Sequence, residues 1–234
     1  MSGRTAAGET GPAPAPPNLF SCAVQKIGTM EASGPPLRLE FGKGRVESLT
    51  DGIFAFGMTL LVLGVGYPIS VQSFAKMPVD QILIASIPYF VLYMVSFLIL
   101  AAFWVSHHVQ FHHFRIIDRT ALWLNLVSLM FVAFVPFTSS LAGFFYTSRL
   151  AAAVFEIHLL VIGLLYHLQW RYATHDHRLV DPRLDPALVR RILGASLVIP
   201  AFSVAGLLLT VGGFRESVFI YFLVPVVLWI RIHH

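Results

Sequence analysis

The sequence predicts an all-α membrane protein with six transmembrane helices per subunit and both termini in the cytoplasm. Of its 234 residues, 56% are hydrophobic and only 12% are charged, whereas soluble domains carry about 25% charged residues. Such a chain cannot cover itself with polar surface, so lipid must solvate most of it. The lengths of the apolar segments and the distribution of the basic residues support the same fold class.

Residues 1–44 are predicted to form a disordered cytoplasmic tail, and residues 45–234 a transmembrane domain. The tail is rich in glycine, proline, alanine and serine, as in GPAPAPPN and SGPP. A segment of this composition buries too little apolar surface to offset the entropy lost on ordering. It shows no signal-peptide pattern, and the single Cys22 excludes an internal disulfide framework.

Six apolar segments follow, each near the roughly 20 residues that a helix needs to cross a bilayer. They are expected at 46–67, 82–106, 121–145, 150–170, 189–211 and 215–231. Proline residues fall within or near the starts of four segments, at Pro88, Pro136, Pro200 and Pro225. Neighbouring helices in a membrane can satisfy the carbonyl that a proline frees, so kinks are expected instead of breaks.

The basic residues predict the orientation of these segments. With six spans and a cytoplasmic amino terminus, thirteen of the sixteen lysine and arginine residues fall on the cytoplasmic side. The three on the other side are Lys76, Arg149 and Arg215. The net charge of +4 therefore reflects membrane topology, and nucleic acid is not an expected partner.

The sequence contains no nucleophile-elbow, P-loop or Rossmann motif, so neither an enzyme nor a cofactor is expected. His108 and His112 share one helical face within a histidine cluster, which is the spacing of a metal site. A helix end at the membrane interface explains the cluster equally well, and no metal is predicted. Gly64–Pro68 resembles a potassium-filter loop, but a turn that ends the first helix fits better because no pore helix precedes it.

Three acidic or histidine residues, Glu156, His158 and His167, lie within the fourth segment. Such residues are functional candidates because burying them in a membrane is costly. Glu156 and His158 are possible proton sensors, and the alternative is that they form hydrogen bonds between helices. A proton-coupled transporter that uses Asp51, Glu156 and His158 is therefore the second functional hypothesis.

The first segment begins with charged and hydroxyl side chains and then becomes apolar. Within it, Phe56, Leu60 and Leu63 are spaced so that they share one face of a helix. If four copies met along this face, the three side chains would form a narrow hydrophobic constriction that gates by dewetting. Ordinary packing against another helix explains the same spacing.

Three motifs, in order, resemble the prokaryotic branch of the transmembrane-protein-175 family of potassium-permeable channels. The first segment reads RVESLTD at 45–51, similar to the family's R-x-x-x-F-S-D, with Leu49 and Thr50 in place of Phe and Ser. The second segment ends FWVSHH at 103–108, and the third begins LWLNL at 122–126 and continues to VPFT at 135–138. The resemblance covers residues 45–232, with Phe56 where the family usually has Ile.

The resemblance implies a six-helix subunit of a homotetramer, with the first helices around a central cation pore. It implies a hydrophobic gate at Phe56, Leu60 and Leu63, and monovalent cations, chiefly potassium, as the ions carried. It further implies a multi-pass protein of the plasma membrane, in contact with lipids, that acts as a channel and not as an enzyme. An inter-helix hydrogen-bond network is expected from Arg45, Thr50, Asp51, His107, Trp123 and Asn125.

Overall fold

The computed structural model describes residues 42–66, 78–214 and 217–233. All of them belong to one compact unit of the chain, Leu39–His234. Most of the predicted tail, including Cys22, lies outside the described residues, as do Lys76 and Arg215.

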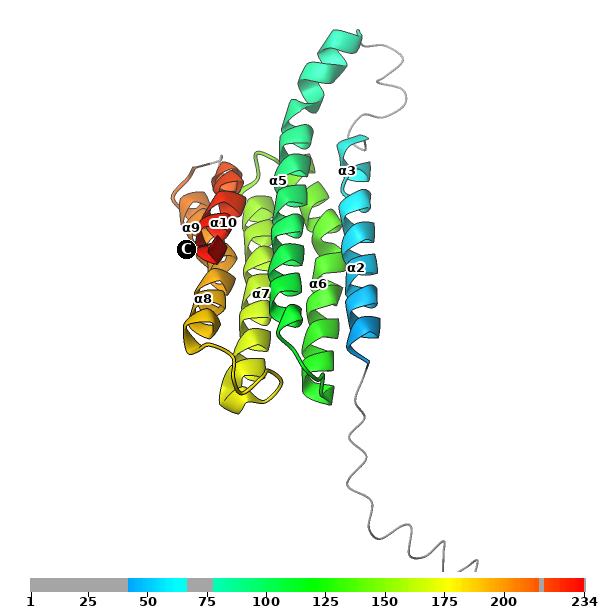
Figure 1. The fold of residues 1–234 in the computed structure, drawn as a ribbon. Coiled ribbons are helices and arrows are strands. Elements are labelled where there is room, and N and C mark those ends of the chain that lie inside the picture. Colours follow the sequence, from blue (N-terminus) through cyan, green and yellow to red (C-terminus); the bar gives the residue numbers. More distant parts are fainter. Residues whose placement is uncertain (1–41, 67–77, 215–216, 234) are drawn as a thin grey trace, which may run out of the picture. The chain divides into compact units, whose positions relative to one another are not determined.

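The described part of the chain is built of helices joined by turns (Figure 1). In chain order they are α2 (Lys43–Leu60), α3 (Leu63–Gly66), α5 (Val79–His112), α6 (Arg119–Phe144), α7 (Arg149–Thr174), η1 (His175–His177), α8 (Pro186–Ser196), α9 (Val198–Val211), η2 (Ser217–Leu223) and α10 (Val224–His233). An isolated β-bridge joins Phe114 to Val180 and ties the α5–α6 turn to the α7–α8 loop. The all-helical prediction is therefore confirmed.

Four stretches are long and apolar enough to cross a membrane: α5, α6, α7 with η1, and the α8–α9 pair. The expectation of six full-length spans is thus met by four of the six predicted segments. The first segment is helical over almost its whole predicted range, in α2 and α3, but α2 carries four charged side chains and is therefore not among these four stretches. The last segment begins as the 3-10 helix η2, and its apolar stretch, Ser217–Arg231, is shorter.

Side-chain caps fix where three of the long helices begin. Asp118 accepts a hydrogen bond from the backbone N–H of Ala121 at 2.8 Å, and Asp185 does the same for Ala187 at 2.8 Å. Ser148 caps α7 in the same way. These short polar side chains satisfy N–H groups that have no partner within the helix, which places the turns between helices at defined positions.

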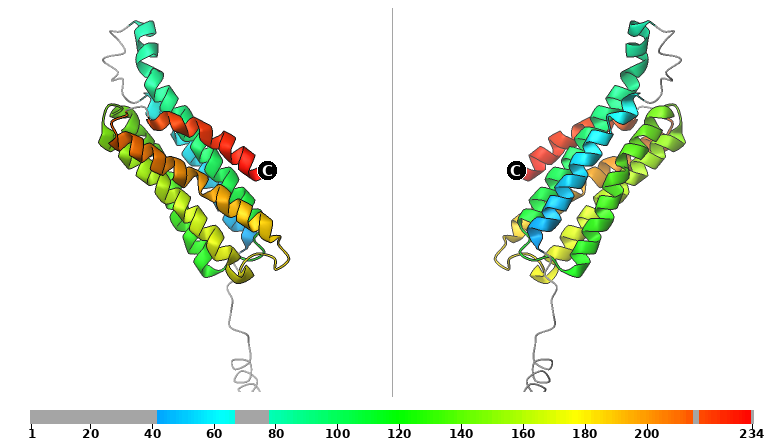
Figure 2. Two further views of the ribbon diagram at one scale, coloured as in Figure 1. Left: turned by 90° about the vertical axis from the view of Figure 1, so that its left-hand side faces the viewer. Right: turned by 90° about the vertical axis from the view of Figure 1, so that its right-hand side faces the viewer.

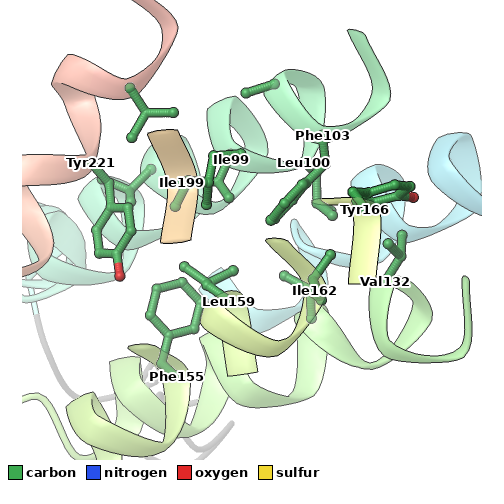
Figure 3. Packing of buried hydrophobic residues seen from close by; sticks show 14 of the residues in the cluster. Ile99, Leu100, Phe103, Val132, Phe155, Leu159, Ile162, Tyr166, Ile199 and Tyr221 are labelled. Atoms are coloured by element: carbon green, nitrogen blue, oxygen red, sulfur yellow. The ribbon is translucent and has the colours of Figure 1, made fainter. Parts of the chain in front are cut away.

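The core lies where α7 meets α5, α6 and α9. Figure 3 shows Phe155, Leu159 and Ile162 of α7 packed against side chains of the other helices, and all three are fully buried. Tyr221 of η2 closes the core at one end, with its ring edge-on to Phe155 at 6.4 Å. Close packing here holds α7 as the central helix of the described unit.

The helix α2 occupies a different position, because it packs against α5 and α6 on one side only. Figure 1 places α2 at the edge of the bundle, beside α6. The right-hand view of Figure 2 shows α2 uncovered in front of α5 and α6. One whole face of α2 is therefore available for other contacts.

Helices α7 and α9 approach each other closely at Gly163. A Cβ atom at this position would lie 2.6 Å from Cδ of Pro200, whose ring cannot rotate away. We therefore expect Gly163→Ala to push the two helices apart and to lower the free energy of unfolding by about 1–3 kcal/mol. Thermal unfolding of the purified protein in detergent measures this loss.

Gly52→Ala is the matched control, because nothing lies within 4 Å of a Cβ added at Gly52. This control is expected to be neutral or slightly stabilising, since alanine is the better helix former. Equal melting temperatures for the Gly163→Ala variant and the wild type would contradict the packing described at this contact.

Candidate functional site

The two faces of α2 differ in what surrounds them. Val46, Thr50, Phe54 and Gly57 are buried against α5 and α6. Their spacing of three and four residues follows one side of a helix. This buried face determines which residues of α2 point the other way.

The opposite face of α2 and the following turn form an exposed strip, which we call the α2 stripe. Its members are exposed and lie three or four residues apart: Arg45, Leu49, Gly52, Phe56, Thr59 and Leu63. Phe56 and Leu63 expose 65% and 66% of their surface. Thr59 donates its hydroxyl to the backbone oxygen of Phe56 at 2.8 Å. The stripe is therefore apolar for most of its length, with a charged residue at one end.

Leu60, the third predicted constriction residue, lies at the border of the stripe and is half-buried. Together with Leu63 it lines a groove of about 460 Å³ between the end of α2 and helix α6. Pro136 and Phe137 form part of the opposite wall. The structure thus brings the three predicted residues to one side of α2, with Phe56 and Leu63 the most exposed.

A buried chain of hydrogen bonds links α2, α6 and α5. Asn125 of α6 donates from Nδ2 to Oγ1 of Thr50 at 3.2 Å. Its Oδ1 lies 3.1 Å from Nε2 of His107 on α5, so His107 donates there. The Thr50 hydroxyl donates in turn to the backbone oxygen of Val46 at 2.9 Å. All three side chains are buried, so each depends on the others for its hydrogen bonds.

The other three predicted network members lie elsewhere. Asp51 accepts a hydrogen bond from Nε1 of Trp104 at 2.9 Å, at an exposed position. Trp123 is 58% exposed, because it lies two residues from Asn125 and so points away from it. Trp104 is the indole that the sequence reasoning missed, although it lies one helical turn before His107.

Arg45 and Asp51, both members of the expected network, do not contact each other in the described residues. Arg45 is on the exposed stripe, while Asp51 lies on the flank of α2 that meets Trp104 of α5. The two positions are six residues apart, which places their side chains on different sides of the helix. No ion pair joins them within the part of the chain that the structure describes.

Lys43 anchors the start of α2. Its Nζ donates to the backbone oxygens of His112 at 3.3 Å and Phe114 at 3.0 Å, where α5 ends. Burial lowers the pKa of the neighbouring His113, and His112 and Lys43 lower it further. Lys43 thereby satisfies carbonyl groups at the end of α5 that have no partner within the helix.

The ionisable residues of α7 belong to separate hydrogen-bonding groups. Glu156 contacts the hydroxyls of Thr210 and Ser217, whereas Nδ1 of His158 lies 2.8 Å from Oγ1 of Thr138. Asp51 has Trp104 as its partner. Within the described residues, these three candidates have separate partners and do not form the single site that a proton-coupled transporter would need.

The histidines do not form a metal site in the region the structure covers. No group of three or more His, Cys, Asp or Glu side chains there is placed to hold an ion. His112 and His113 contact each other edge-on at 5.2 Å between ring centroids. What this region offers is an apolar helix face held in a fixed orientation by buried hydrogen bonds.

Comparisons with known proteins agree on one family. A family model described as the endosomal/lysosomal potassium channel TMEM175 matches residues 45–136, which include α2 and Asn125. A potassium channel of Streptomyces collinus is 36% identical over 151 residues, which cover 63% of this chain and 72% of that protein. A potassium channel of Chamaesiphon minutus is 30% identical over 170 residues, or 69% of this chain and 83% of the relative.

The fold is likewise similar to a solved structure, that of a lysosomal potassium-selective channel TMEM175 homologue from Chamaesiphon minutus. The TM-score is 0.70 at 26% identity, over 82% of this chain and 98% of the other. The human endosomal/lysosomal proton channel TMEM175 is 29% identical over 187 residues. That match covers 77% of this chain but only 34% of the human protein.

Replacing Asn125 tests the buried network. The change Asn125→Ala leaves Nε2 of the buried His107 without an acceptor, whereas Oγ1 of Thr50 loses one donor but keeps its bond to the backbone oxygen of Val46. We expect it to lower the free energy of unfolding by about 1–3 kcal/mol for each group left unsatisfied. Denaturant or thermal unfolding of purified protein measures the effect.

The matched control is Ser128→Ala on the same helix. The Ser128 hydroxyl donates only to the backbone oxygen of Leu124, at 2.8 Å, so its removal strands no partner on another helix. If the two variants lose the same stability, Asn125 does not hold the three helices together.

Proposed function

The chain belongs to the TMEM175 family of cation channels, and on this premise we propose that several copies assemble into a potassium-permeable channel. The pore is lined by α2 of each copy, with the α2 stripe facing the ion path. The observation that carries this proposal is the uncovered stripe, which lies on the helix with the family's characteristic motif.

The composition of α2 supports a position beside water instead of lipid. The helix is short, and it carries Lys43, Arg45, Glu47 and Asp51 within its first nine residues. A charged side chain facing the middle of a bilayer costs about 2.5–3.5 kcal/mol on insertion scales. A helix that borders a central aqueous path avoids this cost, while α5, α6 and α7 offer long apolar surfaces to lipid.

We propose a homotetramer in which four stripes surround one axis. Phe56, Leu60 and Leu63 then form consecutive rings of hydrophobic side chains. Such rings form a hydrophobic gate, since a narrow apolar passage expels water and an ion cannot cross without its hydration. Phe56 and Leu63 are already exposed in the single chain, as residues lining a pore must be.

The ions carried are potassium and other monovalent cations. Relatives from two bacterial species are named potassium channels, and the human relative is named a proton channel. We assign this chain to the potassium-permeable type, because its matches cover most of the length of those two relatives. Its basic residues favour a multi-pass protein with cytoplasmic termini, and we place it in the plasma membrane.

Shortening a constriction side chain tests the gate. Phe56→Ala and Leu60→Ala are expected to raise the basal potassium current in reconstituted bilayers, because a wider passage dewets less readily. The larger effect is expected for Phe56, whose side chain is the more exposed. Single-channel and macroscopic currents measure the change.

The matched control is Phe90→Ala, which removes an equally large and similarly exposed side chain (48%) from α5. Its current is expected to match that of the wild type. Unchanged currents in both α2 variants, with normal protein yield, would remove α2 from the gate. Comparing potassium with sodium flux into liposomes then tests the ion assigned.

A further inference from the structure

Glu156 is fully buried on α7, within a membrane-spanning helix. Its carboxyl group packs closely against α9 and η2. A Cβ atom added at Gly206 of α9 would lie 2.9 Å from Oε1 of Glu156. An ionised carboxylate in such a place needs either a cation or enough hydrogen-bond donors to replace water.

The partners of this carboxyl group are two hydroxyls. Oγ1 of Thr210 lies 3.0 Å from both Oε1 and Oε2 of Glu156. Oγ of Ser217 lies 2.7 Å from Oε1. The two hydroxyl oxygens are themselves 2.8 Å apart. The carboxyl group and the two hydroxyls therefore form a closed ring, which we call the Glu156 ring.

The number of hydrogen atoms available to the ring indicates the protonation state of Glu156. Each hydroxyl carries one hydrogen to donate. With an ionised Glu156, both hydroxyls point at the carboxylate, and the short contact between Thr210 and Ser217 then has no hydrogen in it. With a neutral Glu156, three hydrogens serve three contacts.

In the neutral ring, Oε2–H donates to Thr210, Thr210 donates to Ser217, and Ser217 donates to Oε1. Every hydroxyl then donates once and accepts once, so each of the three pairs of groups shares a hydrogen, and only the second Thr210–carboxyl distance, to Oε1, has none. Only the protonated carboxyl group satisfies the whole ring.

Among the described residues, the charged and ionisable groups nearby offer no alternative partner for a carboxylate. On α7, Arg149 lies two turns away, beside Gly213, where an added Cβ would be 3.2 Å from Nη2, and His158 is bonded to Thr138. Helix α9 has no ionisable side chain. The only one on η2 is Tyr221, which is uncharged at neutral pH. Arg215 and Glu216 lie outside the described residues.

We propose that Glu156 is a proton-binding site that latches η2 to α7 and α9. The bound proton closes the Glu156 ring, and its loss leaves a buried charge that drives Ser217 and the start of η2 away. A small crevice beside Arg149 reaches Thr210 from the α6–α7 turn, which gives the proton a route to the ring. The inference is independent of the proposed pore, because α2 contributes nothing to this site.

The direction of the pH response follows from the number of protons bound. The latched form, with η2 packed on Glu156, holds one proton more than the open form, in which the start of η2 has moved away. The latched form is therefore favoured at low pH and lost as pH rises. Loss of a single proton changes the opening equilibrium by at most about tenfold per pH unit. The C-terminal segment η2–α10 is thus expected to loosen on the alkaline side.

The first test is infrared difference spectroscopy of the full chain in lipid. The carbonyl stretch of a protonated carboxylic acid is expected in the wild type at neutral pH. It should disappear in Glu156→Gln and persist in Glu47→Gln, a control in which the acid is partly exposed and paired with Lys43. Identical spectra for the wild type and Glu156→Gln would overturn the proposal.

The second test is hydrogen–deuterium exchange of residues 203–223 at several pH values, corrected for intrinsic exchange rates. The corrected exchange rate, which reports the opening of η2, should increase with pH in the wild type. It should be independent of pH in Glu156→Gln, because the amide can donate and accept as the neutral acid does. The same pH response in both proteins would contradict the latch.

A third variant, at Thr210, tests the same hydrogen bonds if Glu156→Gln fails to fold. Thr210→Val preserves the shape of the side chain but removes the hydroxyl that Oε2–H donates to. The acid band should then shift to higher frequency, because the carboxyl group has lost a hydrogen bond. An unshifted band in this variant would show that Thr210 does not accept the proton of Glu156.

Discussion

The orientation of α2 depends on one buried asparagine. Asn125 connects Thr50 of α2 with His107 of α5, and all three side chains are buried. Rotating α2 by one residue would withdraw Thr50 from this contact and strand a buried polar group, at a cost of about 1–3 kcal/mol. Hydrophobic packing alone is far less specific, since many rotations of an apolar helix bury similar area. A single amide thereby decides which face of α2 remains uncovered.

The function proposed for the chain follows from that uncovered face. Helices α5, α6 and α7 are long and apolar and are suited to lipid, whereas α2 is short and has its charges at one end. Family membership assigns a cation channel, and the fixed orientation of α2 presents Phe56 and Leu63 where a shared axis would need them. The buried Glu156 ring lies on other helices, so the proposed hydrophobic constriction and the candidate proton site are separate.

Much of this arrangement was predictable from the sequence, because the deciding signals are local. Hydropathy located the helices, and the motifs around Asn125 indicated the family. The hydrogen bond between Trp104 and Asp51 could not be predicted, because it depends on which flank of α2 meets α5. Neither Arg45 nor Trp123, the expected members of the network, contacts Asp51 in the described part of the chain. The Glu156 ring was also out of reach, since Thr210 and Ser217 are more than fifty residues away in the chain. The first and last predicted segments are helical over almost their whole ranges, but α2 carries four charged side chains and the last segment begins as the 3-10 helix η2, so neither is among the four candidate spans.

The most direct test of the central claim is thiol modification of conducting channels along α2. Single cysteines would be introduced in a background in which Cys22 is replaced by serine, and currents recorded before and after a water-soluble thiol reagent. The account predicts block at the stripe positions Phe56, Thr59 and Leu63 and no effect at the buried positions Phe54, Gly57 and Leu61. Block at the buried positions, or unaltered currents at all stripe positions, would contradict the claim that this face of α2 lines the ion path.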